Sequence, residues 1–435
     1  MKPFKRREFL KSMAIGTSSL LIPKIDTSRN TEHDQPNIIL IMADDLGYEC
    51  LSCNGSESYQ TPNLDQLAKT GIRFEHCYSQ PLCTPSRVQI MTGRYNFRNY
   101  KMFGFFDLRE TTFGHVLKNA GYQTCIAGKW QLSNGIEGPF LAGFDEYCLW
   151  QIYTNVAGKD VRGSRYADPK IHQNGQLLQD VRGKYGPDIF CDFINNFIER
   201  HQDKPFCVYY PMVLTHDPFV PTPMSEDWNT QKSRKDEKYF ADMVFYMDLV
   251  IGRIIHRLEE LKLREKTIVI FTSDNGTHQR IRSKFKGQWL QGGKGEMTDA
   301  GTHVPLIVNW PGSVPGGQVS SALIDFTDFF PTLSDIAGAP IPERIKIDGV
   351  SFYPQLSGSE GNPREWVFMH YWGRGRNIFQ TRRCVRNQRW KLYDDGNFFD
   401  ITSDPFEQHP IEPSKIVGEL AILHKQFQSV FDAMK

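Results

Sequence analysis

A short segment beginning at Cys83 combines a thiol, a helix start and two arginines. It reads CTPSR over residues 83–87, and MTGR follows over residues 91–94. Pro85 suits the first turn of a helix, where a backbone amide hydrogen is not needed. The spacing therefore predicts that Cys83 lies at a helix N-terminus, where backbone N–H groups and the helix dipole favour an anion. A reactive thiolate is the plain interpretation, although no Cys-His-Asn arrangement is evident.

Oxygen-bearing side chains follow two apolar segments. Asp44 and Asp45 follow the apolar run 37–42, and Asp274 and Asn275 follow the run 267–272. Ligands bind outside the carboxyl ends of the strands in open α/β sheets, so we expect these four side chains to lie together. Carboxylate and amide oxygens suit Ca²⁺ or Mg²⁺ and do not suit zinc. The sequence therefore predicts a site for one hard divalent cation.

Two more apolar runs end in polar residues that could join this site. Lys129 follows the run 123–127, and His216 follows the run 206–214. Helical patterns lie between the runs, at residues 61–70, 112–120, 188–201 and 239–261. Strands alternating with helices predict an α/β domain with a largely parallel sheet. All six polar residues at the strand ends are therefore expected to converge on one site. Taken singly, each of them could also be a cap or an ordinary loop residue.

The pattern changes near residue 348. Short alternating runs at 367–371, 381–386, 390–393 and 398–401 predict an antiparallel sheet, and residues 413–434 predict a final amphipathic helix. A chain of 435 residues is long enough for a large domain and a smaller one. We therefore expect a catalytic domain over 36–347 and a C-terminal α+β domain over 348–435.

The first 35 residues are expected to be a targeting segment and linker. A basic stretch with paired arginines at 5–11 precedes a modest apolar run at 13–22, which predicts a twin-arginine export signal. The alternative is a basic tail. The run is too short to span a bilayer, so we predict a periplasmic or secreted protein without a membrane span. A net charge of +1 argues against a nucleic-acid partner.

The segment 83–87, with TGR at 92–94, resembles the modification motif of the formylglycine-dependent sulfatases of the alkaline-phosphatase superfamily. The resemblance extends from Pro36 to residues 399–405. It implies an alkaline-phosphatase-like fold, with a large mixed, mostly parallel sheet flanked by helices. It also implies that a maturation enzyme oxidises Cys83 to formylglycine. One hydroxyl of the hydrated aldehyde would attack sulfur, and the second would allow sulfate to leave again.

The same resemblance assigns roles to the other candidate residues. Asp44, Asp45, Asp274 and Asn275 would hold one calcium ion together with the modified Cys83. Arg87 would contact the formylglycine, whereas Lys129 and Lys294 would bind the sulfate oxygens and stabilise their developing charge. His216 would protonate the departing alcohol, a task that suits imidazole.

One position departs from the family pattern. The family commonly has histidine after Gly-Lys-Trp, where it helps to deprotonate the sulfated hydrate, but this chain has Gln131. Glutamine can bind the substrate by hydrogen bonds but cannot accept a proton near neutral pH. The base is therefore unassigned, with His278, His303, a water molecule or a lysine as alternatives.

Exported relatives of this kind often act on sulfated polysaccharides, which makes a sulfated glycan the expected substrate. Segments 95–106, 150–166 and 371–383 are aromatic and basic, and the last contains Trp372, Arg374 and Arg376. Aromatic rings stack on sugars and arginines pair with anions, although ordinary packing would explain these residues equally well. A phosphomonoester or phosphonate monoester hydrolase and a non-catalytic glycan-binding protein are the alternative functions.

The cysteine pattern adds little. The nine cysteines show no repeated metal-ligand spacing, and Cys50 and Cys53 form an isolated CxxC pair. We expect either a local disulfide or two ordinary thiols there, and no zinc site.

Overall fold

The structure is a computed structural model that describes residues 35–153, 163–372 and 381–434. The predicted export signal lies outside these ranges, as do Arg374 and Arg376. Residues 35–435 form one compact unit. None of the described helices is both long and apolar enough to cross a membrane.

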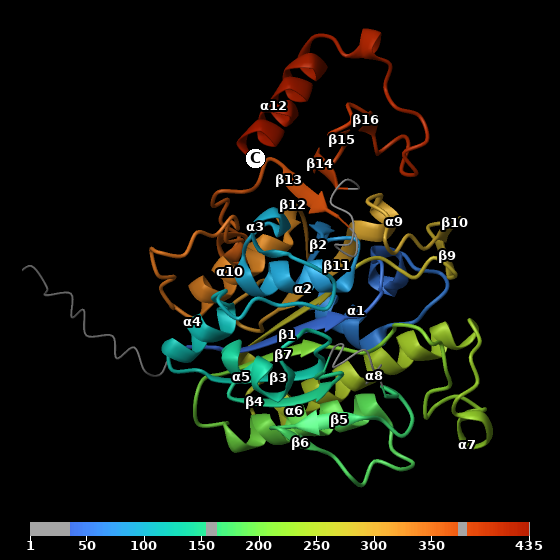
Figure 1. Ribbon diagram of the computed structural model, residues 1–435, viewed down its shortest axis with the longest axis vertical. Coiled ribbons are helices and arrows are strands. Elements are labelled where there is room, and N and C mark those ends of the chain that lie inside the picture. The colour runs from blue at the N-terminus through green and yellow to red at the C-terminus, as the bar shows by residue number, and fades with distance from the viewer. Residues whose placement is uncertain (1–34, 154–162, 373–380, 435) are drawn as a thin grey trace, which may run out of the picture. The chain divides into compact units, whose positions relative to one another are not determined.

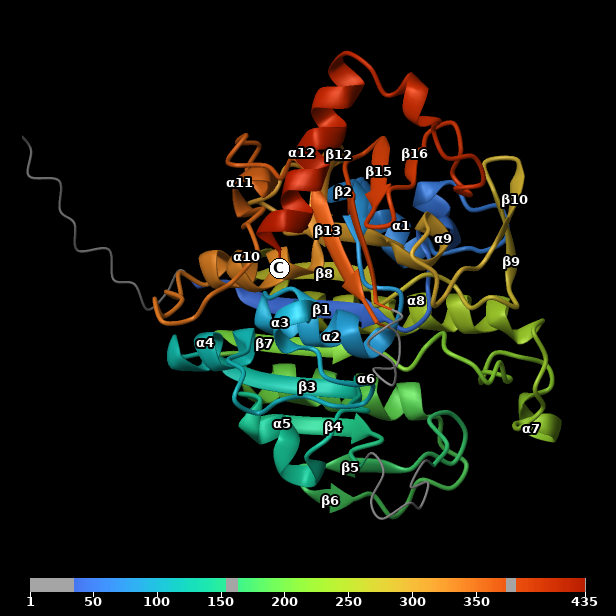
Figure 2. The ribbon, with the colours of Figure 1, turned by 45° about the horizontal axis from the view of Figure 1, so that its top comes forward.

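A ten-stranded mixed sheet organises the chain, with the strand order β12-β2-β11-β8-β1-β7-β3-β4-β5-β6 (Figures 1 and 2). Its strands are β1 (Asn37–Ala43), β2 (Ile72–Tyr78), β3 (Gln123–Lys129), β4 (Glu146–Trp150), β5 (Ile171–Gln173), β6 (Gln176–Leu177), β7 (Phe206–Pro211), β8 (Thr267–Ser273), β11 (His303–Asn309) and β12 (Gln318–Asp325). The five central strands, from β8 to β4, are parallel to one another. Outside this block β5, β6 and β11 pair antiparallel, so the predicted mixed, mostly parallel sheet is confirmed.

Helices cover both faces of the sheet (Figure 2). The longer ones are α1 (Pro62–Lys69), α2 (Cys83–Thr92), α4 (Phe113–Asn119), α6 (Gly186–Arg200), α8 (Tyr239–Glu260) and α10 (Phe329–Ile336); the shorter ones are α3 (Asn96–Asn99), α5 (Gly138–Leu141), α7 (Trp228–Gln231), α9 (Asp299–Thr302) and α11 (Tyr353–Leu356). Ile39 and Ile41 of β1 pack in one core cluster with residues of α1, α6 and α8. Ile38 and Leu40 pack in the other, with residues of α2, α4 and α10. Side chains alternate between the faces of a strand, so burial on both faces explains why β1 is continuously apolar.

The predicted elements are present with small shifts of their ends. β7 ends at Pro211, three residues before the predicted end at Leu214, and the chain then turns toward the site. The last helix, α12 (Glu419–Ala433), begins after Gly418, whose φ of 57° breaks the regular backbone. The observed helix is therefore shorter than the predicted helix over 413–434, because periodicity overlooked this glycine.

A second, four-stranded sheet has the antiparallel pairing that the sequence predicts. Its strands are β13 (Val367–Tyr371), β14 (Arg382–Arg386), β15 (Trp390–Tyr393) and β16 (Phe398–Asp400), in this order. α12 packs on it through Phe427 and Val430. A separate two-stranded hairpin consists of β9 (Arg282–Phe285) and β10 (Gln288–Gln291).

An ion pair and a hydrogen bond join this second sheet to the segment between β10 and β11. Arg386 of β14 donates a hydrogen bond to Asp299, and its guanidinium lies 3.7 Å from the ring centroid of Tyr78. Lys391 of β15 donates to the carbonyl oxygen of Met297 at 2.5 Å and pairs with Glu407 at 2.7 Å. Segment 297–299, which closely follows Lys294, is therefore fixed from the second sheet.

The Arg386–Asp299 pair is expected to contribute to the free energy of unfolding. Burial by itself would raise the pKa of Asp299, but Arg386 and other cations outweigh it and lower the pKa to about 2. We expect Asp299→Asn to cost of the order of 2–4 kcal/mol near pH 7, because Arg386 would lose its charged partner. The difference should shrink as the pH falls from 4 toward 2, because the wild-type carboxylate is then neutralised too. Chemical denaturation over this pH range measures it; a constant difference would contradict the assignment.

Candidate active site

Four adjacent parallel strands bring the polar residues together at their carboxyl ends. Asp44 and Asp45 directly follow β1, Lys129 is the last residue of β3, and Asp274 directly follows β8. His216 lies in the loop after β7, where Thr215 donates its backbone N–H to the carbonyl oxygen of Asp44 at 2.7 Å. The sheet itself therefore creates the cluster that the sequence predicts from separate runs.

Asp44 is buried beside a buried lysine. Lys129 donates to both carboxylate oxygens of Asp44 at 2.8 Å, and Nη1 of Arg165 lies 3.6 Å from Oδ2. Burial by itself would raise the pKa of Asp44, but the surrounding cations outweigh burial and lower it. Asp44 is therefore a carboxylate at neutral pH.

Asp45 is the centre of a second set of contacts. Lys294 donates to its Oδ2 at 2.6 Å, and Asn275 donates to its Oδ1 at 2.8 Å. Its backbone has a left-handed φ of 65°, a conformation that aspartate tolerates better than most residues. The backbone N–H of Asp45 donates to Oδ1 of Asp274 at 3.0 Å, which ties the two strand ends together.

The donor set fits a hard cation. Asp274 is buried and has no ion pair with any residue in the described ranges. Burial and the charge of Asp44 raise its pKa well above the ordinary value. The Oδ1 atom of Asn275 is buried and accepts no hydrogen bond from the described part of the chain. A divalent ion would satisfy this orphaned oxygen and neutralise the excess of carboxylates.

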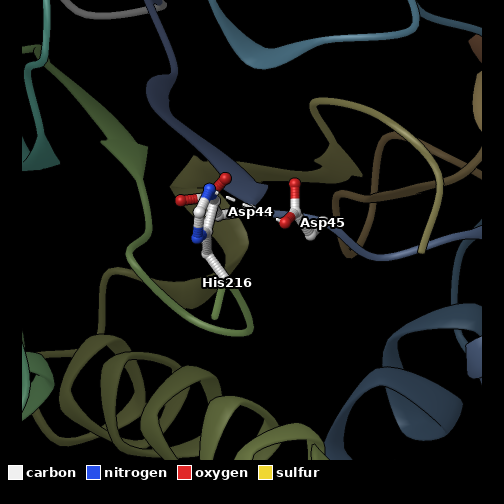
Figure 3. A group of neighbouring side chains, drawn as sticks. All are labelled: Asp44, Asp45 and His216. Carbon is white, nitrogen blue, oxygen red and sulfur yellow. Dashed lines mark ion pairs between the residues drawn. The ribbon is translucent and has the colours of Figure 1, made fainter. Parts of the chain in front are cut away.

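His216 approaches the same carboxylates (Figure 3). One potential ligand atom from each of Asp44, Asp45 and His216 lies within 4.8 Å of the others. His216 has other partners, however: Nδ1 lies 2.7 Å from the carbonyl oxygen of Asp217 and 3.0 Å from its carboxylate, so Nδ1 carries a proton. Nε2 lies 2.9 Å from Nζ of Lys294. The all-oxygen set suits Ca²⁺ better than a set containing this engaged imidazole.

Cys83 is the first residue of α2, as the sequence predicts. It lines a pocket of about 830 Å³ together with Gln131, Arg165, His216 and Lys294. Its Sγ lies 3.9 Å from Oε1 of Gln131. The thiol, the N-terminus of α2 and the cationic side chains therefore face the same pocket.

Arg87 lies one turn after Cys83 and is almost fully buried. Its Nη1 donates to the carbonyl oxygens of Lys129 and Trp130, which fixes α2 against the end of β3. Nε and Nη2 are buried without hydrogen-bond acceptors among the residues described. Two nitrogen atoms of this guanidinium therefore remain available to a ligand.

Neither alternative histidine has the geometry of a base. His303 is buried, stacks on Tyr48 with ring centroids 4.2 Å apart, and does not line the pocket. His278 does line it, but its Nδ1 accepts the backbone N–H of Arg280 at 3.1 Å. In the neutral ring the proton is then on Nε2, which can donate to a ligand but cannot accept a proton from it. A water molecule or a lysine remains for this role.

Some aromatic residues of the three segments line the pocket, and others pack in the core. Phe103, Trp150 and Tyr371 line the pocket, one from each segment. Tyr95, in contrast, packs in the core beneath the second sheet. Sequence reasoning singled out the segment of Arg165 without the residue itself, because no motif surrounds it. It also overlooked Asp217, although the position next to His216 could have suggested an orienting carboxylate.

The cysteine expectation resolves to ordinary thiols. Cys50 and Cys53 are not bridged, and all nine cysteines, which lie in described segments, are free.

A family model described as Sulfatase matches residues 36–339, and one described as N-sulphoglucosamine sulphohydrolase, C-terminal, matches residues 287–431. The chain belongs to the sulfatase family. It is therefore an enzyme that hydrolyses sulfate esters, and its fold is the alkaline-phosphatase-like fold. The first match spans the ten-stranded sheet, and therefore the part of the chain that carries the carboxylate and lysine cluster.

Individual relatives agree with the family assignment. The sulfatase is 33% identical to human arylsulfatase A over 413 residues, covering 85% of this chain and 77% of that protein. It is 27% identical to N-acetylglucosamine-6-O-sulfatase of Bacteroides thetaiotaomicron, covering 94% and 89%. A solved structure of Ps i-CgsB in complex with k-i-k-neocarrahexaose has a TM-score of 0.77 at 25% identity, and 92% of each chain is covered.

Because the buried carboxylates fit a divalent ion, calcium is expected to stabilise the folded protein. Calcium at about 100-fold above its Kd should raise the Tm of the sulfatase by roughly 3–5 °C, because the ion binds only the folded cluster. Asp45→Asn should abolish this shift. In calcium-free buffer, Asp274→Asn should be at least as stable as the wild type, because it removes like-charge repulsion and keeps the oxygen that accepts from Asp45.

Differential scanning calorimetry with and without calcium measures both effects. Asp335→Asn, which changes an exposed carboxylate of α10, is the control and should keep the calcium shift. A calcium shift that survives in Asp45→Asn would place the ion elsewhere.

Proposed function

We propose that this sulfatase works with a formylglycine made from Cys83 and with one calcium ion held by Asp44, Asp45, Asp274 and Asn275. The observation that carries the proposal is the shared pocket, in which Cys83 lies at the start of α2 together with Lys294 and His216. When present, the hydrated aldehyde would supply the nucleophile, and the calcium ion would lower the pKa of its hydroxyl and orient the sulfate.

The residues of the chain then have distinct tasks. The free donors of Arg87 would hold the modified side chain at residue 83, and the N-terminus of α2 would favour negative charge there. Burial by itself lowers the pKa of Lys294, but Asp45 outweighs burial and raises it, so the ammonium stays charged. With the ion bound, Lys294 and Lys129 would turn from the carboxylates toward sulfate oxygens.

His216 would act at the leaving group. Asp217 fixes its Nδ1 proton, so Nε2 is the atom that faces the pocket side, next to Lys294. A protonated Nε2 could donate to the departing alcohol oxygen. Gln131 lies within reach of residue 83 and would position the diol or the sulfate by hydrogen bonds.

We further propose that the substrate is a sulfated carbohydrate and that the protein is exported. Phe103, Trp150 and Tyr371 give the pocket aromatic walls on which a sugar could stack. Two of the compared proteins support a glycan: one is named for N-acetylglucosamine and the other holds an oligosaccharide. The paired arginines near the N-terminus support export.

The nucleophile is tested with protein made in a host that contains the maturation enzyme. Mass spectrometry of the Cys83 peptide should show an aldehyde in place of the thiol. Cys83→Ala should lower kcat for 4-nitrophenyl sulfate at least about 10³-fold, as expected for loss of a covalent nucleophile. The same assay with 4-nitrophenyl phosphate should give a lower kcat/KM in the wild type.

Cys53→Ala, which changes a half-buried thiol outside the pocket, is the matched control and should keep full activity. A strong preference for the phosphate ester would favour the phosphomonoesterase alternative. Full activity in Cys83→Ala would overturn the nucleophile assignment.

A further inference from the structure

A guanidinium on the pocket wall has a buried nitrogen atom without a hydrogen-bond acceptor among the described residues. Arg165 lines the pocket, and its side chain is only 10% exposed. Its Nη1 is buried and forms no hydrogen bond with any residue the structure describes. Burying a charged donor without an acceptor is costly, so such a group commonly marks a ligand position.

Asp44 does not account for this charge. Both carboxylate oxygens of Asp44 accept hydrogen bonds from Lys129 at 2.8 Å, whereas Arg165 lies 3.6 Å from Oδ2. At that distance the guanidinium gains Coulomb energy but no hydrogen bond. A bound divalent ion would neutralise part of the charge of Asp44 and so weaken its attraction to Arg165 still further. Nη1 of Arg165 therefore has N–H groups that could bind another anion.

The side chain is held in place before any ligand arrives. Its guanidinium lies 3.9 Å from the ring centroid of Trp150, which covers one of its two faces. Trp150 in turn donates to the carbonyl oxygen of Gly163 at 2.8 Å. The carbonyl oxygen of Arg165 passes so close to Gly186 that a Cβ there would lie 2.0 Å from it. A planar guanidinium fixed in this way suits bidentate binding of a carboxylate or sulfate.

Arg165 and Lys294 are associated with different carboxylates, whereas Lys129, the other lysine of the expected sulfate clamp, shares Asp44 with Arg165. Lys294 forms an ion pair with Asp45 at 2.6 Å, and Nε2 of His216 lies 3.7 Å from the same carboxylate. Arg165 pairs with Asp44 and is carried by the loop beside Trp150. A pocket of about 830 Å³ is large enough for a substituted sugar. The ester sulfate at residue 83 therefore leaves room for a second anionic group at Arg165.

We propose that Arg165 forms a second anion-binding subsite, which recognises an additional sulfate or carboxylate on the sugar that carries the sulfate ester. The inference rests on the proposed carbohydrate substrate and narrows it to sugars with at least two negative charges. Arg165 is a specificity-determining residue in this account, and the reaction at residue 83 does not pass through it.

The test compares matched substrates in the wild type and in Arg165→Met, which keeps an unbranched side chain over Trp150. One pair is an N-acetylated and an N-sulfated hexosamine O-sulfate, and a second pair is a hexose and a hexuronic acid O-sulfate. Arg165→Met should lower kcat/KM for the doubly charged member about 10- to 100-fold more than for its partner or for 4-nitrophenyl sulfate. The pair that responds shows whether the second group is a sulfate or a carboxylate.

Arg282→Met is the matched control, because Arg282 lies over Trp289 on the exposed β9–β10 hairpin and should not discriminate between the pairs. Arg165→Lys, which keeps the charge but loses the planar fork, should recover only part of the difference. Equal losses on all substrates would overturn the proposal and place Arg165 on the ester sulfate. A wild type that never prefers the doubly charged member would overturn it as well.

A binding measurement separates this proposal from the proposed function. Calorimetry of Cys83→Ala protein with the same sugars requires no turnover. The subsite predicts tighter binding of the doubly charged sugar and a selective loss of that gain in Cys83→Ala/Arg165→Met. If no sugar sulfate is hydrolysed but this selectivity is seen, the proposed reaction fails and the subsite stands; equal binding of both sugars would refute the subsite.

Discussion

Three carboxylates buried at the ends of two neighbouring strands are the constraint on which the rest of this site depends. Asp44, Asp45 and Asp274 are almost fully buried and lie close together, so positive charge must be supplied nearby. Lys129 and Lys294 each neutralise one carboxylate. The third, Asp274, keeps a raised pKa, and the orphaned oxygen of Asn275 lies in the same cluster. In the proposed mechanism, a divalent ion would complete this balance and free the lysines for an anionic substrate.

The surrounding fold keeps these charges at fixed positions. The parallel strands β8, β1, β7 and β3 set the spacing of the carboxylates and of Lys129. Arg87 fastens α2, and with it Cys83, to the end of β3. The second sheet contributes from outside, because Arg386 and Lys391 hold the segment just after Lys294. Cys83 and the cations are thus held in place by three different parts of the chain.

Much of this arrangement could be predicted because the central strands are buried on both faces. Continuous apolar runs revealed β1, β3, β7 and β8, and the polar residues after them marked the edge where ligands bind. Strands such as β12, with exposed Val319 and polar neighbours, lack that signal and went unpredicted. They lie at or near the edge of the sheet, where alternation with solvent replaces a continuous apolar run.

The limits of the prediction at the site are equally physical. Motif residues were found because their neighbours in sequence identify them, whereas Arg165 owes its position to Trp150 and Gly186, which no local pattern connects. His303 was an open alternative in the sequence because only the folded chain shows it stacked on Tyr48. Long-range contacts of this kind decide which charged side chains face a pocket.

Crystals grown with calcium and then with manganese would test the central claim most directly, through an anomalous difference map that locates the bound ion. We expect one ion in contact with oxygens of Asp44, Asp45, Asp274 and Asn275, with residue 83 close enough to share it. An ion bound by His216 without Asp274 and Asn275, or an ion remote from residue 83, would contradict it.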